Sequence, residues 1–256
     1  MSGILFEKKG RTAIITMNRP EVMNALNMEA YRELRNAWIK VKEDPDIWTA
    51  IITGTGERAF CTGQDLKELA AYEARGEHLE YPPELQPGDL EVWKPFIAAV
   101  NGYCLAGGLE VALACDIRVA AEHASFGLSE VMRSIMPSGG GISRLPRLIP
   151  FGRALELLIT GDRIDAQEAY RLGLVNQVVP KEQLMSAAEA LADRINENGP
   201  LAVRSIKEAA YRGYEMSLKD SLRLELLFSD RVERSEDAKE GPKAFVEKRK
   251  PQYKGR

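Results

Sequence analysis

Short apolar runs predict the strands of the first half of the chain. The runs at residues 11–17, 47–53, 96–101 and 117–121 are rich in β-branched and small apolar side chains, and polar or turn-forming residues follow them. Between the first two runs, apolar residues recur at helical spacing over residues 27–43, which predicts an amphipathic helix. A strand, a helix and another strand in this order are typical of an α/β protein.

Helical patterns dominate the remainder of the chain. Helices are expected over residues 152–160 and 184–195, with a shorter one from the capping box at Asp165 and a strand over residues 174–179. After residue 199 no strand pattern occurs.

Three helices are expected in this last part, from Leu201, Ser217 and Ser235, and they carry more apolar positions than a separate segment can bury. The sequence therefore predicts a core over residues 1–198 and a helical oligomerisation region over residues 199–256.

A glycine elbow lies inside the stretch of residues 96–147. Ala106, Gly107 and Gly108 follow a strand and lead into a helical run at residues 109–115. Backbone N–H groups at a helix start are unpaired and the helix dipole adds positive charge there, so the elbow is suited to hold an oxyanion. Glu110 lies in the first turn of this helix.

A second carboxylate, Glu130, follows Glu110 by twenty positions. The two cannot share a helical face, so they meet only if the chain doubles back through the strand at residues 117–121. Taken singly, each is more simply interpreted as a solvated surface glutamate.

Residues 54–59 (GTGERA) fit a dinucleotide-binding fingerprint, which would require a helix to begin at its glycines. Residues 60–63 (FCTG) lack helical periodicity, and the next helical run begins near Leu66, so this alternative is disfavoured.

The composition excludes several other classes. The chain of 256 residues is 45% hydrophobic and 29% charged, as is typical of soluble proteins. No apolar run is long enough for a membrane span, and residues 1–9 do not resemble a signal peptide, so an intracellular, cytoplasmic protein with no membrane partner is expected. Three dispersed cysteines and two histidines make a metal site hard to build.

Several segments together closely resemble the crotonase (enoyl-CoA hydratase/isomerase) superfamily. They are the Asn101–Glu110 motif NGYCLAGGLE, the pair Cys115-Asp116, the FGLSE motif ending at Glu130, and Pro137 with the glycines 139–141. The resemblance implies an α/β fold, a crotonase-like ββα superhelix with a C-terminal helical trimerisation region. It also implies an acyl-CoA thioester substrate, a homotrimer or homohexamer, no cofactor beyond the coenzyme A of the substrate, and no nucleic-acid partner.

The segment AFCTGQDLKEL at residues 59–69 is similar to the family's A-F-x-x-G-x-D-[IL]-K segment. By this resemblance, the oxyanion-hole donors are the backbone N–H groups of Gln64 and Gly107. The residues expected to flank the coenzyme are Thr62, Gln64, Asp65, Leu66 and Lys67. Ala106 departs from the family pattern, in which a third glycine is common.

Because both family glutamate positions are occupied, by Glu110 and Glu130, the preferred function is hydration of a trans-2-enoyl-CoA. Other superfamily reactions stay open, namely Δ3-Δ2 enoyl-CoA isomerisation or a carnitinyl-CoA-type dehydration, and so does a non-enzymatic RNA-binding role.

The C-terminal segment is basic: residues 243–256 hold six Lys and Arg against one acidic residue. It resembles a family segment whose aromatic and lysine reach the coenzyme of a neighbouring subunit, and these positions fall on Phe245 and Lys248. Upstream, residues 70–94 are expected to form a loop or a broken helix over the acyl pocket, with Tyr72, Tyr81 and Trp93 as candidate pocket walls or simple packing residues.

Overall fold

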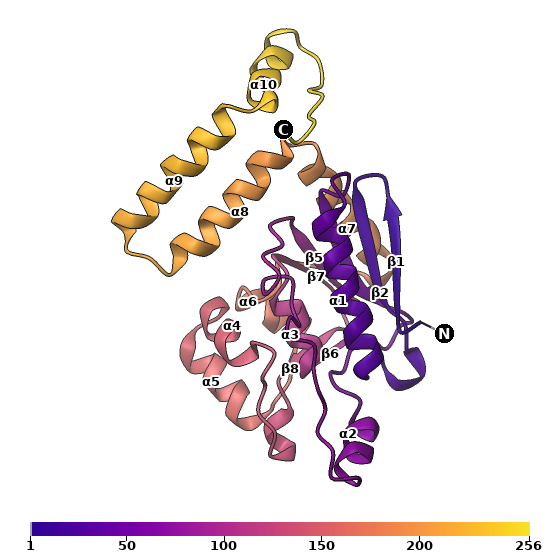
Figure 1. Cartoon of the computed structure of the whole chain (residues 1–256). Helices are drawn as coiled ribbons and strands as arrows, with labels where there is room; N and C mark the ends of the chain where they lie inside the picture. The colour runs from indigo at the N-terminus through magenta and orange to yellow at the C-terminus, as the bar shows by residue number, and fades with distance from the viewer. Residues whose placement is uncertain (1) are drawn as a thin grey trace.

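The computed structural model describes residues 2–256 (Figure 1). Its strands are β1 (Ile4–Lys9), β2 (Thr12–Met17), β3 (Thr49–Gly54), β4 (Ala59–Cys61), β5 (Phe96–Val100), β6 (Tyr103–Leu105), β7 (Ile117–Ala121), β8 (Ser125–Gly127), β9 (Ile164–Asp165) and β10 (Gln177–Val179). Its α-helices are α1 (Met28–Glu43), α2 (Leu66–Glu73), α3 (Gly107–Leu113), α4 (Gly141–Leu148), α5 (Phe151–Thr160), α6 (Ala166–Arg171), α7 (Leu184–Asn196), α8 (Pro200–Tyr214), α9 (Leu218–Glu233) and α10 (Glu236–Val246). Short 3-10 helices are η1 (Pro20–Val22), η2 (Glu130–Arg133) and η3 (Lys181–Gln183).

The strands form two sheets between which the chain alternates. The main sheet has the order β1-β2-β3-β5-β7-β10, and the second has the order β4-β6-β8-β9. The chain passes from β3 to β4, from β5 to β6 and from β7 to β8, so each pass gives one strand to each sheet. All neighbours in the main sheet are parallel except β1 and β2. This winding confirms the α/β fold and its ββα superhelix.

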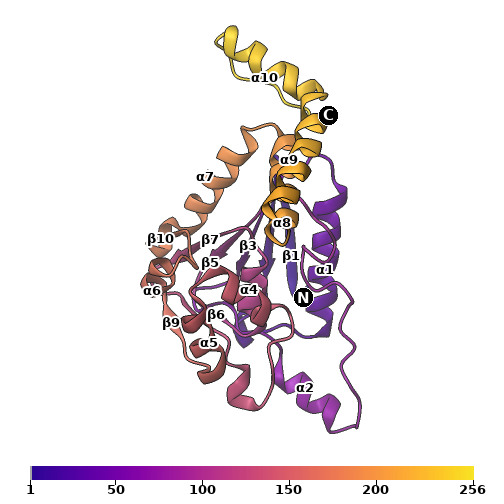
Figure 2. The ribbon, with the colours of Figure 1, turned by 90° about the vertical axis from the view of Figure 1, so that its left-hand side faces the viewer.

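Helices cover both faces of the main sheet (Figures 1 and 2). Leu184 and Ala188 of α7 pack in one buried cluster with Ile51 of β3. On the opposite face, Trp38 of α1 packs edge-on against Phe96 of β5, with ring centroids 5.3 Å apart. Asn27 caps α1 because its side chain accepts a hydrogen bond from the Ala30 N–H at 2.9 Å.

Most expected elements are present, with shifted ends. The expected helix at residues 27–43 is α1, the strand at residues 117–121 is β7, and the strand expected at residues 174–179 is shortened to β10. The glycines at residues 54–56 lead into the strand β4 and not into a helix, which confirms that the dinucleotide fingerprint is a chance match.

The last three helices, α8, α9 and α10, project from the core (Figure 1). The side chain of Lys207 on α8 holds them to the core through an ion pair with Asp116 at 2.8 Å. Large apolar side chains on these helices are exposed: Ile206, Tyr211, Tyr214, Leu218, Leu222, Leu226, Leu227, Phe245 and Val246. The division at residue 198 and the oligomerisation role stay predictions. Within residues 2–256, no helix is both long and apolar enough to cross a membrane.

Candidate active site

A cavity of about 1060 Å³ opens beside the glycine elbow. The structure brings together on its wall all the catalytic and coenzyme-flanking residues that the sequence predicts within residues 1–198: Thr62, Gln64, Asp65, Leu66, Lys67, Gly107, Glu110 and Glu130. These residues come from three separate passes of the superhelix. The cavity is therefore the candidate active site.

Two backbone N–H groups face this cavity without acceptors. Gly107 begins α3, and among the described residues 2–256 neither its N–H nor that of Gln64 donates a hydrogen bond. They lie close together, because a Cβ built on Gly107 would be 3.9 Å from the Gln64 nitrogen. Such paired donors suit the oxygen of a thioester that gains negative charge.

The backbone on both sides of these donors is tightly constrained. Gly63 has a φ of +87°, and a Cβ there would approach the Gly107 nitrogen to 2.8 Å. Ala106 has a φ of 50° and a ψ of −131°, a conformation that glycine adopts more easily. The departure from glycine seen in the sequence thus falls on a strained residue.

Asp65 supports this arrangement structurally. Its carboxylate pairs with Arg19 at 2.9 Å and accepts from the Lys67 N–H at 3.1 Å, which caps α2. The side chain thus fixes the start of α2, directly after Gln64.

Glu110 is buried in the first turn of α3, with 6% of its surface exposed. Its Oε1 accepts a hydrogen bond from the Gly141 N–H at 2.9 Å. A Cβ on Gly139 would lie 2.6 Å from its Oε2, so the glycine cluster leaves room for the carboxylate. Burial raises the pKa of Glu110, whereas the N–H groups of Gly141 and Gly139 act in the opposite direction.

Glu130 starts the 3-10 helix η2 on the same cavity. Its Oε2 is buried and has no hydrogen-bond partner in residues 2–256. Burial raises the pKa of Glu130 to about 7, and the charge of Glu110 adds to the increase. The two carboxyl groups therefore have different environments, which suits one to act as a base and the other as an acid.

Two further cavity residues had no functional signal in the sequence. Tyr31 lies at helical spacing with the apolar face of α1, so it is typical of a core residue; its hydroxyl is 3.3 Å from a Cβ built on Gly107. Gln86 lies in the irregular loop before β5, where no pattern marks it.

Of the three aromatic residues expected as pocket walls, only Tyr81 lines the cavity. It packs edge-on against Tyr31 at 5.5 Å and donates a hydrogen bond to Gln64 Oε1. For the other two, the packing interpretation holds: Tyr72 lies under the Arg75 guanidinium, and Trp93 lies 6.4 Å from the ring of Tyr211.

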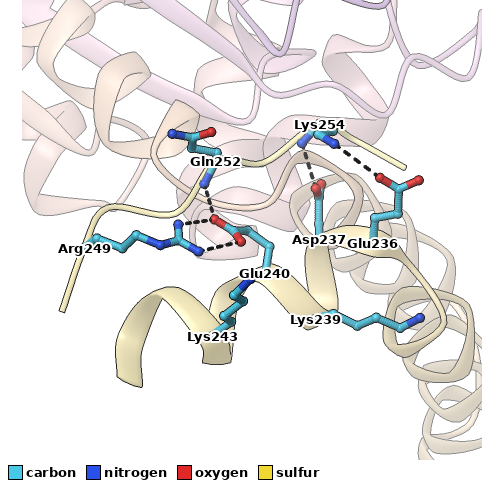
Figure 3. Close-up of a pocket in the computed structure, with 8 residues that line it drawn as sticks. All are labelled: Glu236, Asp237, Lys239, Glu240, Lys243, Arg249, Gln252 and Lys254. Carbon is cyan, nitrogen blue, oxygen red and sulfur yellow. Dashed lines mark hydrogen bonds and ion pairs between the residues drawn. The ribbon is translucent and has the colours of Figure 1, made fainter. Parts of the chain in front are cut away.

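Phe245 and Lys248 do not line this cavity in their own chain. Phe245 is 85% exposed at the end of α10. A smaller cavity of about 380 Å³ lies nearby, between α10 and the terminal segment (Figure 3). Its charged groups are largely paired, as with Glu240 and Arg249, so it fixes the chain end and offers no reactive group. No cluster of three metal-ligating side chains occurs in residues 2–256.

Comparisons with known proteins agree with this geometry. The family model "Enoyl-CoA hydratase/isomerase" matches residues 7–256. An (E)-benzylidenesuccinyl-CoA hydratase of Thauera aromatica is 40% identical over 98% of this chain and 99% of its own, and a carnitinyl-CoA dehydratase of Proteus mirabilis is 41% identical over 97% of both. The crystal structure of an enoyl-CoA hydratase from Mycobacterium tuberculosis H37Rv superposes with a TM-score of 0.93, at 41% identity and full coverage of both chains. The chain therefore belongs to the crotonase, or enoyl-CoA hydratase/isomerase, family.

Proposed function

We propose that the protein is a hydro-lyase that adds water to a trans-2-enoyl-CoA thioester and forms a 3-hydroxyacyl-CoA. The observation that carries the proposal is the meeting of two unpaired backbone N–H groups, at Gln64 and Gly107, with two carboxyl groups in one cavity. The relatives named as hydratases and dehydratases support the same class of reaction.

In the proposed reaction, the thioester oxygen accepts hydrogen bonds from both N–H groups, which stabilise the enolate that forms when water attacks the β-carbon. Each such donor contributes about 2.7–4 kcal/mol to the transition state. Glu110, whose charge is supported by the Gly141 N–H, takes the proton from water. Glu130, whose pKa is raised to about 7, delivers a proton to the α-carbon.

The remaining cavity residues are proposed to hold the coenzyme. Thr62, Leu66 and Lys67 surround the start of α2, where the polar backbone and one cationic side chain suit a nucleotide. Phe245 and Lys248 are proposed to contact the coenzyme of a neighbouring subunit in a homotrimer or homohexamer. The exposed apolar faces of α8 and α9 support such an assembly.

The test is an assay of the purified protein with crotonyl-CoA and with 3-butenoyl-CoA. Loss of the conjugated enoyl absorbance with the first substrate supports hydration. Its appearance with the second, without hydration of the first, would instead identify a Δ3-Δ2 isomerase. Dehydration of a carnitinyl-CoA is the alternative that the relative from Proteus mirabilis favours, and the same assay with that thioester tests it.

A further inference from the structure

Unpaired polar atoms are concentrated in the candidate active site. In residues 2–256, five buried side-chain nitrogen or oxygen atoms lack a hydrogen-bond partner. Three of them line the cavity: Glu130 Oε2, Gln64 Nε2 and Gln86 Oε1. Glu130 has a role in the proposed hydration, but the two amide groups have none. Because burying an unpaired polar group is costly, these amides require an explanation.

Of the two amides, that of Gln86 is the more deeply buried. Only 4% of its surface is exposed, yet its buried Oε1 has no hydrogen-bond partner in residues 2–256. Its backbone N–H is paired with Asp89 Oδ2 at 3.0 Å, so the backbone position is fixed by other contacts. The buried amide oxygen therefore makes no hydrogen bond that would hold the loop in place.

The Gln64 amide is half paired. Its Oε1 accepts a hydrogen bond from the Tyr81 hydroxyl, which orients the group and leaves Nε2 buried without a partner at the cavity wall. Tyr81 and Gln86 belong to the same loop between α2 and β5, so this loop supplies polar groups to a wall that also holds Leu85 and Tyr31. An alkyl chain there would displace water without replacing its hydrogen bonds.

We propose that the acyl group of the substrate carries a neutral hydrogen-bonding substituent, such as a hydroxyl group, which Gln86 and Gln64 recognise. This inference rests on the proposed function, because it assumes that an acyl-CoA occupies the cavity. A hydroxyl both donates and accepts, so it satisfies amide groups in either orientation. A hydroxyl is preferred to a carboxylate because neither Gln86 nor Gln64 carries a positive charge that would pair with an anion, and the Glu110 carboxylate lies in the same cavity.

Calorimetric binding of saturated thioesters tests the inference without catalysis. The probes are pentanoyl-CoA, 5-hydroxypentanoyl-CoA and glutaryl-CoA, with butanoyl-CoA and 4-hydroxybutanoyl-CoA as a second pair. At least one hydroxylated thioester is expected to bind about tenfold tighter than its alkyl counterpart, and glutaryl-CoA is expected to bind more weakly than both five-carbon probes.

The variant Gln86→Met keeps the shape of the side chain and removes its hydrogen bonds. It is expected to lower the affinity ratio of hydroxylated to alkyl thioester by about tenfold, with a Tm equal to or above that of the wild type. Gln167→Met, at an exposed position on α6 outside the cavity, serves as the matched control and leaves the ratio unchanged.

Two outcomes overturn the inference: alkyl thioesters binding as tightly as both hydroxylated ones, or tighter binding of glutaryl-CoA. A lower Tm of Gln86→Met with an unchanged affinity ratio also overturns it, because Gln86 would then be structural. Failure of the proposed function would give a different pattern of results. The hydroxylated probe would bind preferentially while the unsaturated substrates stay unhydrated.

Discussion

Glu110 and Glu130 differ in what surrounds their carboxyl groups, and this difference assigns their expected roles. Glu110 accepts a hydrogen bond from Gly141, whereas Glu130 Oε2 has no partner in the described chain. We expect Glu110→Gln and Glu130→Gln each to lower kcat by about 10²-fold or more, because each removes a proton-transfer group and keeps its shape. Steady-state hydration assays measure kcat, and Glu122→Gln, at an exposed position, is the control.

The affinity for a saturated acyl-CoA distinguishes loss of proton transfer from structural damage to the site. Binding of butanoyl-CoA should change little in both variants, because the glutamine carbonyl at position 110 can still accept from the Gly141 N–H and Glu130 Oε2 has no hydrogen bond to lose. Turnover close to that of the wild type in either variant would remove that residue from the mechanism.

The raised pKa of Glu130 also predicts how rate and stability depend on pH. Hydration requires Glu130 to be protonated, so kcat/KM should fall as pH rises above about 7. Between the ordinary carboxyl pKa of 4.5 and about 7, the folded protein retains a proton that the unfolded chain has released. The free energy of unfolding therefore decreases as pH rises through this window.

Glu130→Gln is neutral at every pH and escapes this penalty. We expect its Tm to exceed that of the wild type at pH 8, and the difference to shrink as the pH is lowered to 5. Scanning calorimetry at both values measures the difference. A difference that is constant with pH would show that Glu130 ionises normally in the folded protein.

The site residues that the sequence predicts are those with a fixed place in a motif. The glycine elbow and the glutamate after FGLS were found because local backbone geometry requires their neighbours. Tyr31 and Gln86 could not be found, because their place on the cavity depends on contacts between segments far apart in the chain. The contacts of Phe245 and Lys248 with a neighbouring subunit's coenzyme stay predictions.

At the scale of elements, the elbow between β6 and α3 depends on Gly63 in a separate segment. A Cβ at this position would meet the Gly107 nitrogen and Ala106 Cβ, both at 2.8 Å, and the φ of +87° is unfavourable for alanine. Gly63→Ala should therefore displace an oxyanion donor and lower kcat by about 10²–10³-fold.

Gly152→Ala is the matched control, because a Cβ there meets nothing within 4 Å and the residue lies in helix α5. It should keep full activity and raise the Tm slightly, since alanine favours helix. Steady-state kinetics and melting curves of both variants measure these effects. A fully active Gly63→Ala would show that the elbow tolerates the added Cβ.

The elements that sequence patterns missed share a physical reason. The strands β4, β6 and β8 have three residues each, too few to show a period. In β1, lysines and a glutamate occupy most of the exposed positions of an edge strand, and α4 contains Pro146 and begins at glycine. The longer elements, α1, α7 and β7, were predictable because a full apolar face must be buried.

At the scale of the whole molecule, the exposed side chains on α9 bear on assembly. Leu226 and Leu227 are each 71% exposed, which favours a partner surface over solvent. Light scattering should give the mass of a trimer or of a hexamer of two trimers. Leu226→Glu should shift the distribution toward smaller species, whereas Leu5→Glu on the edge strand β1 should not. An active monomer at micromolar concentration would contradict the proposal.

Assembly and catalysis are linked by Lys248, which is absent from the cavity of its own chain. If it pairs with a coenzyme phosphate in a neighbouring subunit, Lys248→Ala should raise KM and make it less sensitive to salt. The kcat should stay nearly unchanged, because the contact is equally strong in the ground and transition states. Lys239→Ala is the control, because Lys239 is exposed on α10, the helix that precedes Lys248, and forms no ion pair within residues 2–256.

Mixed oligomers test whether this lysine acts between chains. Subunits with Glu130→Gln are expected to be inactive but to carry an intact Lys248, whereas subunits with Lys248→Ala are expected to be active with a high KM. When the two are exchanged into common oligomers, all turnover comes from the second kind of site. Such a site next to a Glu130→Gln subunit regains the lysine, so the KM of the mixture should fall toward that of the wild type. A KM that stays high after verified subunit exchange would mean that Lys248 does not serve a neighbour's coenzyme.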